Sequence, residues 1–332
     1  MTTATDLRKR YREILAAKGL TLVPGAYDAL SARIMEHVGF EAISAGGYAA
    51  QGSLLAEVDG GQGNYRDYAD HYGRLCDAVN LPVYVDADTG FGGVHNIRKM
   101  VRAFERAGVA GFFISDQVFP NRCGYLPGKQ IVSTAEMLAR LYAALDARTD
   151  PNMVIAARTD ALHLEGIDAA IERCQLFFEA GVDAVKPMGA DSWDDSVKVF
   201  KQLKGPHSYT MSHAAGKAKL TITQVEELGY SVCTFPSAAL FAAVGGVKRA
   251  MDALKKDMSF AAVEDEIAPL EEYYDIVRLQ RHNDLEQKYV EDGERLAAKR
   301  KKAAERALHW TGQAEVKWLS WRAWRKLGRA RR

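Results

Sequence analysis

Two carboxylates stand close together in the segment VDADTGFGG, residues 85–93. Asp86 and Asp88 follow an apolar run and are two residues apart, so on a strand both side chains would point to the same side. Such a pair can hold a hard divalent cation, Mg2+ or alternatively Mn2+, through oxygen ligands and retained waters. The other interpretation is that one carboxylate caps a helix while the second is solvated.

Cys123 is the second group that could do chemistry, and it lies in the loop FPNRCGYLPGKQIVS. Positive charge from Arg122 and Lys129 favours its thiolate, which suits a nucleophile or a proton donor. Glycine and proline on both sides of the cysteine are typical of a lid that closes over a substrate. The alternative is an incidental surface cysteine.

The elements that must position these groups alternate along the chain. Short apolar runs are followed by longer amphipathic segments that end in Ala-Gly, as in NIRKMVRAFERAG, and this pattern predicts strands alternating with helices. Eight such units predict an α/β fold, a closed (β/α)8 TIM barrel with parallel strands. An open doubly wound sheet is the alternative, but no GxGxxG follows a strand. The predicted strands are 22–25, 42–45, 83–86, 111–115, 154–157, 184–186, 208–211 and 231–235.

Polar residues gather where these predicted strands end. In a barrel the carboxyl ends of the strands meet at one face, so convergent polar groups from several strands predict one shared site. The residues concerned are Ser44, Gly46, Gly47, Asp86, Asp88, Ser115, Asp116, Arg158, Lys186, Ser212 and His213.

The chain of 332 residues has a formal net charge of only +1, but its charges are unevenly distributed. Residues 299–332 contain twelve Lys and Arg against two Glu, together with four of the five tryptophans. No apolar run approaches the roughly 18–20 residues of a membrane span. The N-terminus lacks an apolar signal segment, and the four cysteines form no CxxC pair. These features predict a soluble cytoplasmic protein.

Composition divides the chain into a barrel (1–255), a helical extension (256–304) and a basic, Trp-rich tail (305–332). We expect the extension to pack on a neighbouring subunit. The tail is expected to contact a partner subunit through its tryptophans, with an anionic surface or an acidic partner as the alternative. Nothing resembles a base-reading fold, so sequence-specific nucleic-acid binding is not expected.

The chain resembles the isocitrate lyase/phosphoenolpyruvate mutase superfamily over roughly residues 22–250. Three motifs carry this resemblance: VDADTGFG, the Asp-Gln followed by RCGYLPGK, and IAARTDA. The similarity is greatest to short members that act on methylisocitrate, dimethylmalate and related 2-hydroxy diacids. The resemblance implies a (β/α)8 barrel, a Mg2+ site, and a homotetramer built as a dimer of dimers. In that assembly the last barrel helix is exchanged between partner subunits.

The resemblance also implies a role for individual residues. It makes Asp86 the direct metal ligand, Asp88 the holder of a metal-bound water, and Arg158 the group that stabilises an alkoxide or carboxylate. His213 is a candidate substrate contact, although a hydrogen-bonded structural histidine is the alternative. The resemblance further implies a carboxylate-binding loop at Ser44, Gly46 and Gly47 and a catalytic pair, Cys123 and Gly124.

The activity implied is a Mg2+-dependent carbon–carbon lyase acting on a small anionic carboxylate, a 2-hydroxy di- or tricarboxylate. Loss of the hydroxyl proton breaks the C2–C3 bond to give a 2-oxo acid and an enolate-like carboxylate, which Cys123 protonates. Alternatives are a hydrolase, decarboxylase or mutase acting on oxaloacetate-like or phosphonopyruvate-like substrates, although Cys123 argues against a mutase. An alternative of another class is a catalytically silent barrel used as a binding protein.

Several residues depart from the superfamily pattern. Tyr125 replaces a histidine beside the catalytic pair, and as a candidate catalytic residue it would transfer protons poorly because a phenol has a pKa near ~10. Ser115 and Met188 each replace an acid. Either Glu57 or Asp59 stands at a position that is usually Asp.

Lys186 adds a positive charge where the acids replaced by Ser115 and Met188 are missing. It is two residues before Met188, so on a strand the two side chains point to the same side. Three interpretations of Lys186 as a catalytic-site residue compete. We favour a cation that binds an extra anionic group of the substrate while metal binding is weakened. The others are a Schiff-base amine that replaces metal chemistry, and a protein that has lost catalysis.

Overall fold

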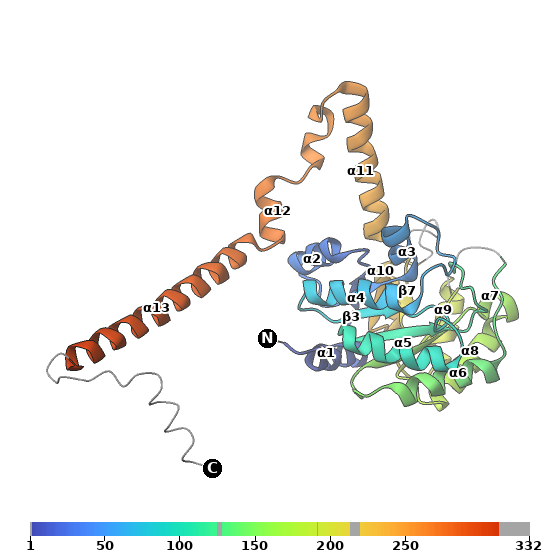
Figure 1. Cartoon of the computed structure of the whole chain (residues 1–332). Coiled ribbons are helices and arrows are strands. Elements are labelled where there is room, and N and C mark those ends of the chain that lie inside the picture. Colours follow the sequence, from blue (N-terminus) through green and yellow to red (C-terminus); the bar gives the residue numbers. More distant parts are fainter. Residues whose placement is uncertain (1, 125–127, 191, 213–219, 312–332) are drawn as a thin grey trace, which may run out of the picture. The chain divides into compact units, whose positions relative to one another are not determined.

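The computed structural model describes residues 2–124, 128–190, 192–212 and 220–311, with side chains as far as residue 305. The chain forms two compact units, Met1–Ala268 and Pro269–Arg332. Figure 1 shows the strands of the first unit surrounded by helices that include α4, α5, α6 and α8.

Eight parallel strands form the sheet of the first unit. One group pairs in the order β2-β3-β4-β5-β6 and the other in the order β1-β8-β7. Parallel bridges Gly25↔Ser44 and Val185↔His207 join the two groups at both edges. The sheet therefore closes on itself, which confirms the α/β, TIM-barrel-like prediction and shows that the open-sheet alternative is wrong. The strands are β1 Thr21–Pro24, β2 Ile43–Ala45, β3 Val83–Asp86, β4 Gly111–Ser115, β5 Val154–Thr159, β6 Ala184–Pro187, β7 Tyr209–Thr210 and β8 Val232–Phe235.

The helices around the sheet follow from amphipathic segments with defined ends. In α5 the side chains of Ile97, Met100, Val101 and Phe104 are buried on one face, and Gly108 ends the helix with φ +89°. The predicted Ala-Gly stop is thus present, because glycine adopts this left-handed conformation without strain. The helices are α1 Ala4–Ala16, α2 Ala29–Val38, α3 Gly47–Leu55, α4 Tyr65–Ala78, α5 Val94–Ala107, α6 Thr134–Ala147, α7 Leu162–Glu165, α8 Ile167–Glu179, α9 Trp193–Gln202, α10 Ile222–Leu228 and α11 Ala238–Asp257, followed by the 3-10 helix η2 Ala261–Glu266.

Helix α1 closes the amino-terminal end of the barrel, a role that the sequence did not indicate. The ring of Tyr11 stacks on Tyr84 of β3 at 5.2 Å between centroids. Arg8 donates to the carbonyl oxygen of Val109, just before β4, and pairs with Asp150, just before β5. Tyr11 and Ile14 of α1 thereby join the buried apolar cluster at this end of the barrel.

The second unit is helical, with α12 Leu270–Ile276 and the 33-residue α13 Leu279–Thr311. This confirms the helical continuation predicted after the barrel. Tyr289, Val290 and Leu296 on α13 are exposed. In the described part of the chain, no helix is long and apolar enough to cross a membrane. The predicted contacts of the tail tryptophans lie outside the described residues.

Candidate active site

A cavity of about 70 Å³ lies at the carboxyl ends of the strands. It brings together groups from loops and strands that are far apart in sequence. The predicted residues that line it are Ser44, Gly46, Gly47, Asp86, Cys123, Gly124, Arg158 and Lys186. Asp88 contacts Asp86 instead, and the strand-end residues Ser115, Asp116 and Ser212 do not line the cavity. Tyr125 and His213 lie outside the described residues. The charged and polar residues that line it are Ser44, Asp59, Asp86, Cys123, Arg158, Lys186, Thr210 and Thr234.

The two predicted metal-binding carboxylates meet at the start of α3. The backbone N–H of Gly47 donates to Asp86 Oδ2 at 3.2 Å, and the N–H of Asp88 donates to Asp86 Oδ1 at 2.8 Å. A Cβ at position 47 would lie 3.0 Å from Asp88 Oδ1 and 3.3 Å from Asp86 Oδ2. Any larger residue at position 47 would require these carboxylates to shift by a few tenths of an ångström. The interpretation of one carboxylate as a solvated surface group is wrong, because both are buried.

Asp59 is a third carboxylate beside Asp86 and Asp88. Of the two acids that could stand at the position that is usually Asp, Glu57 and Asp59, it is the one that lies at the site. Asp59 is 5% exposed and lines the cavity, whereas Glu57 is exposed. Burial, and then the charge of Asp86, raise the pKa of Asp59 to about 7 against the opposing charge of Arg158. Burial and the charge of Asp86 likewise raise the pKa of Asp88 well above its ordinary value.

These carboxylates fit a divalent cation. Three buried oxygens, Asp59 Oδ1, Asp88 Oδ2 and Asn121 Oδ1, accept no hydrogen bond from the described residues. Neighbouring buried carboxylates repel one another, and a cation would relieve that repulsion. Within the described residues no three acidic, His or Cys side chains are placed so that together they could hold a metal ion, so the protein would supply at most two such ligands. The arrangement suits Mg2+, which is held by one or two carboxylates and keeps several waters.

Asp160 joins the loop after β4 to the end of β5, and sequence reasoning missed it although it lies in the IAARTDA motif. Arg158 donates to both of its oxygens, from Nε at 2.9 Å and Nη2 at 3.1 Å. Lys129 Nζ donates to Asp160 Oδ1 at 3.1 Å and to the carbonyl oxygen of Gly124 at 2.5 Å. Burial opposes ionisation, but the charges of Arg158 and Lys129 and the hydrogen bonds lower the pKa of Asp160 to about 2.

The Asp160 network places the cysteine loop over the cavity. Cys123 is 9% exposed and its N–H donates to the carbonyl oxygen of Asp59. The alternative of an incidental surface cysteine is therefore wrong. A Cβ on Gly124 would lie 2.8 Å from Arg158 Nη2, so a larger residue here would require the guanidinium to shift away from its position on Asp160.

Lys186 lies beside Arg158 in the strand register and is 6% exposed. Its Nζ is 4.4 Å from the centre of the Phe113 ring. No residue in the described ranges forms a hydrogen bond or an ion pair with it. Burial first, and then the charge of Arg158, lower the pKa of Lys186 to about 8, while Asp86 opposes this shift.

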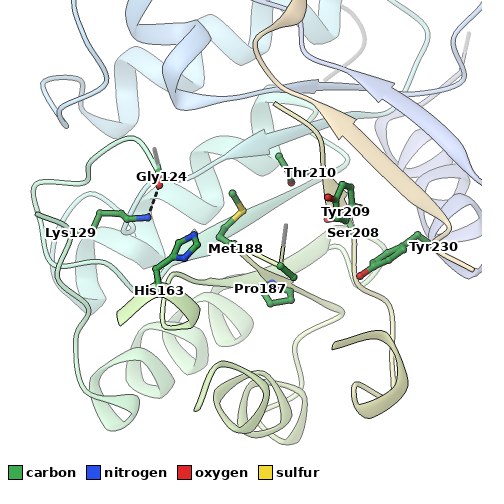
Figure 2. A pocket seen from close by; sticks show the side chains of 11 residues that line it. Gly124, Lys129, His163, Pro187, Met188, Ser208, Tyr209, Thr210 and Tyr230 are labelled. Atoms are coloured by element: carbon green, nitrogen blue, oxygen red, sulfur yellow. Dashed lines mark hydrogen bonds between the residues drawn. The ribbon is translucent and has the colours of Figure 1, made fainter. Parts of the chain in front are cut away.

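The remaining departures from the superfamily pattern lie on the same face. Ser115 is fully buried and its Oγ accepts from the N–H of Gln117 at 3.2 Å. Met188 separates the cavity from a second pocket and lines both, as do Gly124 and Thr210. Figure 2 shows this second pocket, with Met188 between Lys129 and His163 on one side and Thr210 on the other.

The fold and the site together define a TIM-barrel-like protein with one cluster of ionisable groups at the carboxyl ends of its strands. Residues 11–255 match the sequence profile of the family described as phosphoenolpyruvate phosphomutase. The chain belongs to the PEP mutase/isocitrate lyase superfamily.

Similar proteins include lyases and a hydrolase. The chain is 33% identical over 290 residues to 2,3-dimethylmalate lyase of Eubacterium barkeri, covering 87% of this chain and 99% of the relative. It is 34% identical over 266 residues to 2-methylisocitrate lyase of Aeropyrum pernix, covering 80% and 85% respectively. A solved structure of oxaloacetate acetylhydrolase with the inhibitor 3,3-difluorooxalacetate has a TM-score of 0.81 and 27% identity, covering 86% of this chain and 97% of that one.

Proposed function

We propose that this protein is a Mg2+-dependent lyase that cleaves a short 2-hydroxy di- or tricarboxylate to a 2-oxo acid and a carboxylate. The observation that carries the proposal is the convergence of Asp86, Cys123 and Arg158 in one cavity, with Asp88 in contact. A proton donor, a fixed cation and a carboxylate pair are the groups that this cleavage needs. The names of the lyase relatives support the same substrate class.

Asp86 and Asp88 would hold the metal, and Mg2+ when bound supplies Lewis-acid polarisation of the substrate's hydroxyl and carboxylate. The backbone at Gly46 and Gly47 begins helix α3, where N–H groups favour a substrate carboxylate. The Arg158 guanidinium, fixed by Asp160, stabilises negative charge that develops as the C2–C3 bond breaks.

Cys123 donates a proton to the carbanion that leaves, and removes it in the reverse direction. Its position supports this role, because it is buried in the cavity on a loop joined by Lys129 to Asp160. Burial of the cysteine also limits the access of bulk water, which would compete with it as the proton source.

The test is a panel of 2-hydroxy diacids, alkylmalates, oxaloacetate and phosphonopyruvate, incubated with purified protein in Mg2+ or in EDTA. We expect Mg2+-dependent conversion of one hydroxy acid to an oxo acid, detected by mass spectrometry. Turnover that is equal in EDTA contradicts the role given to the metal. A folded protein that binds Mn2+ but converts no member of the panel contradicts the lyase proposal.

A hydrolase or decarboxylase acting on an oxaloacetate-like substrate is a second candidate. It is favoured by the similarity to oxaloacetate acetylhydrolase and by the loss of two acids at Ser115 and Met188. Loss of carbon dioxide or acetate from oxaloacetate in the same panel identifies this activity. The silent-barrel alternative predicts that the protein has no metal affinity, so Mn2+ binding would contradict it.

A further inference from the structure

Lys186 differs from the other cations around the cavity because, among the described residues, it forms no ion pair and no hydrogen bond, although the charge of Asp86 acts on it. Arg158 pairs with Asp160, and Lys129 pairs with the same carboxylate and with a carbonyl oxygen. The ammonium of Lys186 lies over the face of the Phe113 ring, 4.4 Å from its centre. A buried ammonium without a hydrogen-bond acceptor is costly, so the position is not explained by stability of the fold.

The surroundings of Lys186 are those of a subsite for an anion. Its side chain lines the cavity on the β6 side, and the next strands contribute the hydroxyl groups of Thr210 and Thr234, which are 3.0 Å apart. The carboxylates Asp86 and Asp88 belong to β3 and the loop after it, which is not adjacent to β6 in the barrel. The cavity therefore has the cation and the two hydroxyl groups on strands β6 to β8 and the carboxylates at β3, although the charge of Asp86 still acts on Lys186.

We infer that Lys186, with the Thr210 and Thr234 hydroxyls that line the same cavity, binds a second carboxylate of the substrate, remote from the 2-hydroxy carboxylate. This inference rests on the proposed function and deepens it, because it names the residues that hold the second carboxylate of the substrate. The second carboxylate supplies the acceptor that the ammonium lacks. Met188, two residues further along the chain, offers an apolar contact to the carbon atoms between the two carboxylates.

The test compares two acids with the same four-carbon skeleton, malate and 2-hydroxybutyrate, which differ in the distal carboxylate. Dissociation constants are measured by calorimetry in excess Mg2+ for the wild type, Lys186→Met and Lys186→Arg. A hydrogen-bonded ion pair accounts for a difference on the order of tenfold to a hundredfold in affinity. We expect Lys186→Met to bind malate about tenfold to a hundredfold more weakly than the wild type. Its affinity for 2-hydroxybutyrate should equal that of the wild type. Lys186→Arg should bind malate with an affinity between those of Lys186→Met and the wild type.

Lys201→Met is the matched control, because Lys201 is exposed on α9 and lies outside the cavity. It should leave both constants unchanged. The melting temperature of Lys186→Met should not fall, because the substitution removes a buried charge without a partner. A marked fall would identify a structural lysine and overturn the inference.

Other outcomes separate the inference from the proposed function. If the wild type binds both acids and Lys186→Met weakens both equally, only the inference is overturned, because Lys186 then acts on the shared 2-hydroxy carboxylate. If the wild type binds neither these two acids nor any hydroxy acid of the wider panel in Mg2+, the proposed function is contradicted. Borohydride treatment with oxaloacetate or pyruvate is a further arm: added mass at Lys186 would show a covalent imine and overturn the ionic role.

Discussion

Three carboxylates, Asp59, Asp86 and Asp88, are buried at the open end of the barrel, and each has a pKa above its ordinary value, chiefly because of burial. In the unfolded chain they ionise near pH ~4, so above that pH the folded protein binds more protons than the unfolded chain. Their contribution to stability therefore falls as the pH rises through the folded-state pKa, which is about 7 for Asp59.

We predict that the melting temperature in EDTA falls between about pH 5 and about pH 8, and that Mg2+ raises it more at the higher pH. The metal binds the ionised carboxylates and so offsets the cost of their charge. Thermal denaturation in EDTA and in excess Mg2+ at both pH values measures this. A Mg2+ effect that is equal at the two pH values would contradict the assignment of the metal to these groups.

Gly47→Ala tests the same carboxylates without removing them. The new Cβ would press on Asp88 Oδ1 and Asp86 Oδ2, so the carboxylates must move. We expect Mn2+ affinity, measured by electron paramagnetic resonance, to fall by about tenfold to a hundredfold, as when the support of a metal ligand is disturbed. Gly46→Ala is the control, because its Cβ would meet only Pro236 Cβ at 3.6 Å, an ordinary contact.

Cys123→Ser tests the proton donor. A hydroxyl is a far weaker acid than a thiol, so turnover of the preferred substrate should fall by about a hundredfold or more. Binding of an oxo-acid product should be unchanged, because Cys123 is assigned no part in holding the substrate's carboxylate. Steady-state kinetics and calorimetry separate the two effects. Turnover that persists within a few-fold would assign proton transfer to another group.

At the scale of elements, the end of β5 depends on Asp160, whose side chain is fully buried between Arg158 and Lys129. Asp160→Asn leaves two largely buried cations with a neutral partner, and we predict a loss of about 3 kcal/mol in the free energy of unfolding. Urea denaturation measures it. Asp168→Asn is the control, since that carboxylate is 79% exposed in its pair with Lys198 and should contribute less than about 1 kcal/mol. If Asp160→Asn and Asp168→Asn lower the free energy of unfolding equally, the ion pairs of Asp160 with Arg158 and Lys129 do not stabilise the fold more than an exposed pair does.

The strands could be predicted because their signal is local. Each observed strand begins and ends within two residues of its prediction, since apolar runs and glycine stops lie in the segment itself. The role of Asp160 could not be predicted, because its partners Lys129 and Gln117 are 31 and 43 residues away in sequence. The same holds for Tyr11, whose stacking on Tyr84 exists only once the barrel has formed. Local sequence patterns thus predict the strands and helices, whereas the side-chain contacts at the site depend on segments that are far apart in sequence.

At the scale of the whole molecule, α11 carries apolar residues that its own unit leaves exposed. Val244, Val247, Met251 and Leu254 are between 38% and 62% exposed. They are spaced alternately by three and four residues, which places them on one side of the helix in the pattern used for helix–helix packing. The stripe supports the proposal, based on the superfamily resemblance, that this helix packs on a second copy of the chain in a dimer of dimers.

Val247→Glu tests that assembly, because it places a charge in the centre of the stripe. Burying an unpaired carboxylate at an interface is unfavourable, so we expect the variant to have a smaller mass than the wild type by light scattering after gel filtration. Lys256→Glu introduces the same side chain on the opposite side of α11, where it should leave the mass unchanged. A wild type that is already monomeric, or a Val247→Glu protein of unchanged mass, would contradict packing through this stripe. The active-site cavity lies within one chain's barrel, so Mn2+ affinity should survive dissociation, and its loss would mean that a second copy completes the metal site.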